Sequence, residues 1–135
     1  MSRAEILAKF EDHGVLPTQQ RLEVADVLLG KPQHLSADQI IEKLRKENST
    51  VSKATVYNTL KLFEKNGLVK ECLVDPERRF YDSTTQPHHH FYNADTGELS
   101  DIPISDVEVS GLPQLPAGTQ LEGAELMVRI RNSAE

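Results

Sequence analysis

The 135-residue sequence predicts an α+β fold, in which a winged helix-turn-helix is followed by a small strand-rich domain. Three observations predict it. Four capped, amphipathic segments fill the first 67 residues, two short β-rich runs follow them, and the remainder alternates like strands between turns that contain glycine and proline. These patterns predict a winged-helix domain over 1–83, a hinge at 84–87 and the strand-rich domain over 88–135.

Common capping residues predict where the first two helices begin and end. The first runs from Arg3 to His13 and ends at Gly14, because glycine readily adopts the left-handed conformation that closes a helix. The second begins after Thr18, a suitable N-cap, and continues to about Leu29.

Stronger signals begin the third and fourth helices. Ser36, with Gln39 three residues on, forms a capping box, and Ser52 caps the fourth helix, which ends at Gly67. Beyond it, "LVKECLV" and "RRFYDS" read as two strands joined by a turn at "DPE", residues 75–77. Helices followed by a hairpin match a winged helix; the alternative is a small α+β domain with no nucleic-acid role.

The fourth helix favours the winged helix, because its outer face suits DNA. Val56 and Thr59 fall on the core side, whereas the far side carries lysines and an asparagine, and Glu64 is the only acid in 51–70. Lysine can neutralise phosphate and asparagine can pair with an adenine edge in the major groove. The candidate DNA contacts on this helix are Ser52, Lys53, Thr55, Tyr57, Asn58, Lys61 and Lys65.

Charge is divided unevenly along the chain. Residues 1–70 carry 11 Lys/Arg and 9 Asp/Glu, a balance of +2, and residues 71–135 carry 4 and 12, a balance of −8, which together give the net charge of −6. Because steering toward phosphate depends on the local field, the N-terminal half could approach DNA despite the acidic total.

Composition limits the remaining classes. No apolar run approaches the roughly 18 residues of a membrane span, and the N-terminus lacks a signal peptide's apolar core, so we expect a cytoplasmic protein without a membrane partner. Cys72 is the only cysteine, which rules out an internal disulfide and a Cys-rich zinc site within the chain. We expect Cys72 to be a small packed side chain, and a metal would need imidazole and carboxylate ligands.

The C-terminal half reads as a thin sheet. "HHHFYNADTGELSDIPI" predicts a hairpin, and "GAELMVRIRN" predicts a further strand with two different faces. Because so little sheet buries little core and leaves open edges, we expect a homodimer, and the fold class becomes a winged helix followed by a strand-rich dimerisation domain.

Three consecutive histidines begin this half. In a strand, His88 and His90 point to one face and His89 to the other, so the first two could chelate a metal. Candidate partners are the carboxylates Asp82 and Asp101 and the imidazole of His34. The alternative is an exposed polar strand.

Five motifs occur in order over nearly the whole chain: "PTQQR", "QHLSADQI", "SKATVYNTLKLFEKNGLV", "RRFYD" and "HHHFY". Together they resemble the ferric uptake regulator (Fur) superfamily of dimeric winged-helix repressors. The resemblance implies a regulatory metal site at His34, Asp82, His88, His90 and Asp101, holding Fe²⁺, Mn²⁺ or Zn²⁺. Many members also hold a structural zinc on two pairs of cysteines; here Asn93 and Thr96 occupy the first pair's positions, so that zinc is not expected.

The cysteine-free tail resembles the iron response regulator (Irr) branch, which implies haem as the iron signal, with His88, His89 and His90 as candidate haem residues. The Cys-Pro haem motif of some members is missing, because Leu73 follows Cys72. Arg21, in "PTQQR", would hold the DNA backbone.

The resulting hypothesis is an iron- or haem-responsive regulator that binds double-stranded promoter DNA as a homodimer. Three alternatives stay open. One is an Fe²⁺- or Mn²⁺-dependent sensor without haem, the second a metal-dependent hydrolase that uses the histidines and Asp101, and the third an interaction module that does not bind DNA. We expect no enzyme, because no general base stands out near the possible metal ligands.

Overall fold

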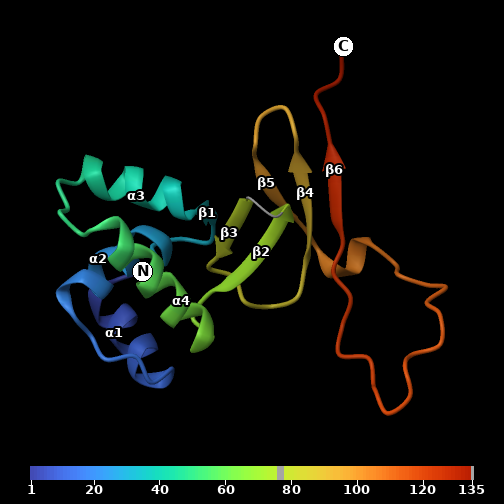
Figure 1. The fold of residues 1–135 in the computed structure, drawn as a ribbon, viewed down its shortest axis with the longest axis horizontal. Coiled ribbons are helices and arrows are strands. Elements are labelled where there is room, and N and C mark those ends of the chain that lie inside the picture. The colour runs from blue at the N-terminus through green and yellow to red at the C-terminus, as the bar shows by residue number, and fades with distance from the viewer. Residues whose placement is uncertain (76–77, 135) are drawn as a thin grey trace. The chain divides into compact units, whose positions relative to one another are not determined.

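The computed structural model describes residues 1–75 and 78–134, which divide into two compact units, one over Met1–Thr85 and the other beginning at Gln86. The first unit combines a helical cluster with a small sheet (Figure 1). Its helices are α1 (Arg3–Asp12), α2 (Gln19–Leu28), α3 (Ala37–Lys46) and α4 (Lys53–Lys65), and its strands are β1 (His34–Ser36), β2 (Lys70–Asp75) and β3 (Arg78–Asp82).

The four predicted helices are confirmed, and local hydrogen bonds explain where they begin and end. The Ser36 hydroxyl accepts the Gln39 N–H while the Gln39 side chain accepts the Ser36 N–H, which is the predicted capping box. The Ser52 hydroxyl likewise accepts the Thr55 N–H. Gly67, at φ +78°, follows the end of α4 in the left-handed conformation that glycine adopts without strain.

The wing is an antiparallel sheet with strand order β1-β3-β2. The hairpin β2-β3 is confirmed, whereas the short strand β1 is an addition that the sequence pattern did not predict. Pro76 and Glu77, in the predicted turn between β2 and β3, lie outside the described residues. Helices followed by this sheet form the expected winged helix.

One apolar core holds the first unit together. The Phe10 and Phe63 rings lie 5.5 Å apart and join α1 to α4. The other side chains of this core that are fully buried include Ile6, Val24, Leu28, Ile40, Val56 and Leu60. Cys72 is buried as predicted.

The second unit is a three-stranded sheet with order β5-β4-β6. Its strands are β4 (His89–Asn93), β5 (Leu99–Ile102) and β6 (Met127–Ile130), and a single 3₁₀ turn, η1 (Ile104–Asp106), follows β5. The predicted hairpin is β4-β5, and the strand predicted near the C-terminus is β6, which pairs in parallel with β4. Only three apolar side chains of this unit's described residues are buried, Tyr92, Leu99 and Ile102.

Within the described part of the chain, no helix is long and apolar enough to cross a membrane.

Candidate metal ligands and nucleic-acid interface

The first unit brings one predicted imidazole against one predicted carboxylate. Antiparallel pairing of β1 with β3 sets His34 opposite Asp82, and the His34 Nε2 lies 3.1 Å from Asp82 Oδ2. The other oxygen, Asp82 Oδ1, accepts the Thr84 N–H at 2.8 Å. Because Asp82 is fully buried and held on both sides, this carboxylate has little freedom to move. We call these two residues the His34–Asp82 pair.

A second group forms in the second unit, where β4 pairs with β5. His88 Nε2 lies 3.2 Å and His90 Nε2 3.6 Å from the same oxygen, Asp101 Oδ1. One ligand atom from each of these three residues lies within 4.8 Å of the others. Both imidazoles therefore share a face of the strand, as the alternation predicts. We call these three residues the β4–β5 cluster.

The tautomer of His88 suits a cation. Its Nδ1 lies 2.6 Å from the Gln86 carbonyl oxygen, which can only accept, so Nδ1 carries the proton. A neutral His88 then presents the Nε2 lone pair toward Asp101, the arrangement in which a metal ion binds an imidazole and a carboxylate together. His88 and His90 are 7% and 3% exposed, so the alternative of an exposed polar strand is wrong.

His89 has different surroundings from its two neighbours. It is 1% exposed, and its Nδ1 accepts the Leu126 N–H at 2.8 Å, which ties β4 to the segment before β6. The three candidate haem residues are thus divided between the two faces of the strand, and one of them has a structural hydrogen bond.

The donor set of each group is imidazole nitrogen and carboxylate oxygen. Such donors suit Fe²⁺, Mn²⁺ and Zn²⁺. The positions of the structural zinc that the resemblance would place here are filled differently: the Asn93 side-chain oxygen accepts the N–H groups of Asp95 and Thr96, and its nitrogen donates to the Asn132 side chain at 2.9 Å. An amide network therefore occupies the turn between β4 and β5.

The outer face of α4 is exposed as predicted. The buried positions of this helix are Val56, Thr59, Leu60 and Phe63. Tyr57 is 46% exposed, and Lys53, Asn58, Lys61 and Lys65 are also exposed. Ser52 and Thr55 are engaged with each other, since the Ser52 hydroxyl donates to Thr55 Oγ1 at 2.8 Å in addition to capping the helix. The side-chain oxygens of Ser52 and Thr55 therefore make hydrogen bonds that stabilise the N-terminus of α4.

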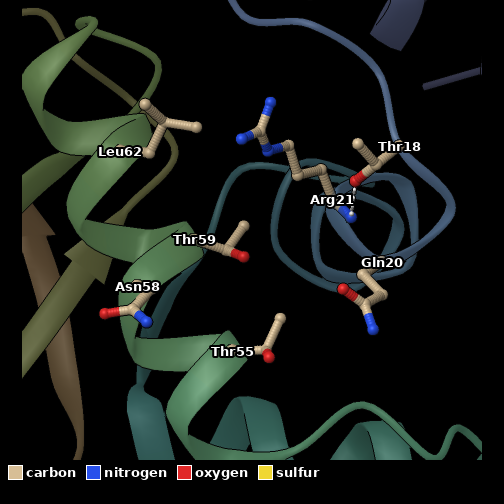
Figure 2. Close-up of a pocket in the computed structure, with 7 residues that line it drawn as sticks. All are labelled: Thr18, Gln20, Arg21, Thr55, Asn58, Thr59 and Leu62. Carbon is tan, nitrogen blue, oxygen red and sulfur yellow. Dashed lines mark hydrogen bonds between the residues drawn. The ribbon is translucent and has the colours of Figure 1, made fainter.

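A cleft of about 380 Å³ separates the start of α2 from α4. Figure 2 shows Thr55 and Thr59 of α4 on one side of it and Gln20 and Arg21 of α2 on the other. Arg21 Nη1 donates to the Leu16 carbonyl at 2.8 Å, so its guanidinium is oriented by the backbone. Gln20 also lines this cleft, although it was not among the predicted DNA-binding residues. Its position in the first turn of α2, two residues after the N-cap Thr18, is the feature of the sequence that could have indicated this.

Comparison with known proteins gives one consistent result. The model of the ferric uptake regulator family matches residues 12–128. The peroxide operon regulator of Bacillus subtilis strain 168 is 33% identical over 98 residues, which are 73% of this chain and 68% of that protein. Among solved structures, the ferric uptake regulator of Francisella tularensis with iron has a TM-score of 0.74 at 23% identity, covering 90% of this chain and 94% of that one. The ferric uptake regulator of Vibrio cholerae gives 0.72 at 23% identity, covering 93% and 98%.

Proposed function

Because the chain belongs to the ferric uptake regulator family, we propose that it is a cytoplasmic, metal-responsive transcription regulator that binds promoter DNA as a homodimer. The observation that carries the proposal is the β4–β5 cluster, in which two buried imidazoles meet one carboxylate oxygen. Buried histidines around a carboxylate suit a divalent ion better than they suit a core.

The proposed ligands are those that the family resemblance implies. The His34–Asp82 pair and the β4–β5 cluster together would hold one Fe²⁺, Mn²⁺ or Zn²⁺ ion, because neither group alone supplies a full coordination sphere. When bound, the ion supplies a positive charge that neutralises the two carboxylates. Deprotonated ligands are needed, so protons compete with the ion and metal affinity should weaken as the pH is lowered.

The proposed DNA interface is the exposed face of α4. Tyr57 and Asn58 would contact base edges in the major groove, and Lys53, Lys61 and Lys65 would neutralise phosphates. Across the cleft, Arg21 would hold the backbone.

Homodimer formation is supported by the second unit. Its buried apolar core is small, while several large apolar side chains are exposed: Phe91, Ile104, Val109, Leu112, Leu115, Leu121, Leu126 and Ile130. A second copy would cover such a surface and would present two winged helices to a palindromic site.

A haem-responsive regulator of the Irr type is the second candidate. It is favoured by the cysteine-free tail and the three consecutive histidines. Haem would need the imidazoles of the β4–β5 cluster to become accessible, since both are less than a tenth exposed. Because the Bacillus subtilis relative is named a peroxide operon regulator, hydrogen peroxide should also be tested as a signal.

The decisive experiment is a DNA titration followed by fluorescence anisotropy. A duplex selected in vitro by the Mn²⁺-loaded protein is titrated with the metal-free protein, and then with Mn²⁺, with Mn²⁺ and hydrogen peroxide, and with hemin. Mn²⁺ should change the affinity by about 5- to 150-fold, the usual range for coupled sites, and sedimentation of the complex should give two chains per duplex.

Lys61→Ala/Lys65→Ala tests the interface itself. Losing two phosphate contacts should lower affinity more than tenfold and reduce the slope of log K against log salt by about two. Lys43→Ala/Lys46→Ala, on the exposed side of α3, is the matched control and should keep the parental slope. Equal behaviour of the two double variants would overturn the assignment of α4, and a hemin response without any Mn²⁺ response would favour the haem candidate.

A further inference from the structure

The cleft between α2 and α4 contains a polar side chain that is buried without a hydrogen bond. Thr59 is 5% exposed and lines this cleft, and Figure 2 shows its side chain pointing from α4 toward α2. A threonine within a helix often donates to the carbonyl four residues earlier. Within residues 1–75 and 78–134, the Thr59 hydroxyl makes neither this bond nor another. Because a buried hydroxyl without a partner destabilises a fold, a partner from outside the chain would stabilise it.

The N-terminus of α2 forms the opposite wall of the cleft and supplies backbone donors. Thr18 satisfies two N–H groups there, since its hydroxyl accepts the Arg21 N–H and its carbonyl accepts the Leu22 N–H. The N–H groups of Gln19 and Gln20 have no protein partner in the part of the chain that the structure describes. The first N–H groups of a helix are its positive end, and they bind anions readily.

The charge of the cleft also suits an anion. Arg21 carries the one positive charge; its Nη1 donates to the Leu16 carbonyl, and the guanidinium has further N–H groups to offer. The other lining residues are uncharged: Thr18, Gln20, Thr55, Asn58, Thr59 and Leu62. Although the chain has 21 acidic residues, none lines this cleft among the residues that the structure describes. Hydroxyl, amide and guanidinium donors without a carboxylate recognise an oxyanion rather than a metal ion.

We propose that this cleft binds a phosphate group, to which Thr59 donates the hydrogen bond that its hydroxyl lacks within the chain. Arg21 supplies the positive charge, and the first N–H groups of α2 complete the site. Two sources have this chemistry, a phosphate of the DNA backbone and free inorganic phosphate. The first source rests on the proposed function, because α4 in the major groove would bring the start of α2 to the backbone.

Thr59→Val separates a ligand-binding role from a structural one, because it removes the hydroxyl and keeps the shape of the side chain. The free chain loses no hydrogen bond, so the urea midpoint of the full-length variant should equal or exceed that of the parent. Its affinity for the phosphate group should nevertheless fall about tenfold, since a hydrogen bond to a charged group is lost. Thr59→Ser keeps the hydroxyl and is the matched control, with affinity within about threefold of the parent.

The DNA backbone is tested as the source by replacing single phosphates of the selected duplex with uncharged methylphosphonates. Replacement at one position in each half of the duplex should weaken the parent and Thr59→Ser about tenfold. Thr59→Val should bind the unmodified duplex about tenfold more weakly and should lose little more at that position. The two changes remove the same hydrogen bond, so their effects should not add. Fluorescence anisotropy measures all these affinities.

Free phosphate is tested by NMR of the metal-free full chain. Sodium phosphate is titrated against sodium chloride of equal ionic strength, and the backbone amide signals of Gln19 and Gln20 are followed. If free phosphate occupies the cleft, these signals should shift in the parent and in Thr59→Ser. In Thr59→Val the same shift should need about tenfold more phosphate.

The outcomes keep this site apart from the proposed function. A methylphosphonate effect that Thr59→Val abolishes supports a DNA phosphate, and amide shifts that Thr59→Val weakens support free phosphate. If Thr59→Val matches the parent with every duplex and with phosphate, the cleft binds neither and the proposal is overturned, even where Lys61→Ala/Lys65→Ala weakens DNA binding. Absence of any duplex binding would instead overturn the proposed function, and the NMR titration would still decide on the cleft.

Discussion

At the scale of single residues, three adjacent histidines have two different surroundings because side chains alternate along a strand. His88 and His90 meet the carboxylate of Asp101, whereas His89 accepts a backbone N–H from Leu126 on the other face. A proposed metal ligand and a structural side chain therefore follow one another in the sequence with the same chemistry. Only their neighbours distinguish them.

Substituting these histidines one at a time should separate the two roles. His89→Ala leaves the Leu126 N–H without its acceptor and should cost about 1–3 kcal/mol of unfolding free energy, while Mn²⁺ affinity stays within about twofold of the parent. His90→Ala should weaken Mn²⁺ more than tenfold, with a smaller loss of stability. Urea unfolding and calorimetric Mn²⁺ titration measure both. A folded His89→Ala variant that no longer binds Mn²⁺ would assign His89 to the metal site.

At the scale of elements, the helices were predictable and part of the sheet was not. Each helix begins at a hydrogen bond between residues three apart, as between Ser36 and Gln39, so a short stretch of sequence contains the whole signal. The strand β1 has three residues and no strand pattern; it exists because β3, more than 40 residues later, pairs with it. The parallel pairing of β4 with β6 joins residues that are 37 positions apart. The imidazole of His34 and the carboxylate of Asp82 made these residues candidate metal ligands from the sequence alone. The register that sets them opposite each other depends on the pairing of β1 with β3.

The junction of β1 and α3 gives a prediction at this scale. Ser36 belongs to the strand that contains His34 and also caps α3. Ser36→Ala should cost about 1 kcal/mol of stability through the lost cap and should also weaken Mn²⁺ binding, because His34 is two residues away. Ser2→Ala removes the same kind of capping box from α1 and should cost a similar amount without changing Mn²⁺ affinity. If both variants bind Mn²⁺ like the parent, the cap of α3 has no part in positioning His34.

At the scale of the whole molecule, charge divides along the boundary between the units. Residues 1–85 contain 13 Lys/Arg and 13 Asp/Glu, whereas residues 86–135 contain 2 and 8 and so account for the entire net charge of −6. DNA would repel such an acidic second unit. Its proposed influence on DNA is therefore indirect, through the partner copy and through an ion whose ligands come from both units.

The length of the connection between the units should therefore control the response to metal. Inserting four and then eight Gly/Ser residues between Thr85 and Gln86 lowers the effective concentration of the His34–Asp82 pair at the β4–β5 cluster. Mn²⁺ should then bind more weakly, and its effect on DNA affinity, expected at about 5- to 150-fold in the parent, should shrink with each insertion. Thr85→Gly/Gln86→Ser changes composition without length and should keep the parental response. Calorimetry and anisotropy with the selected duplex measure the two quantities. Full coupling in the eight-residue insertion would mean that one ion does not join the two groups, because a connection of that length no longer holds them together.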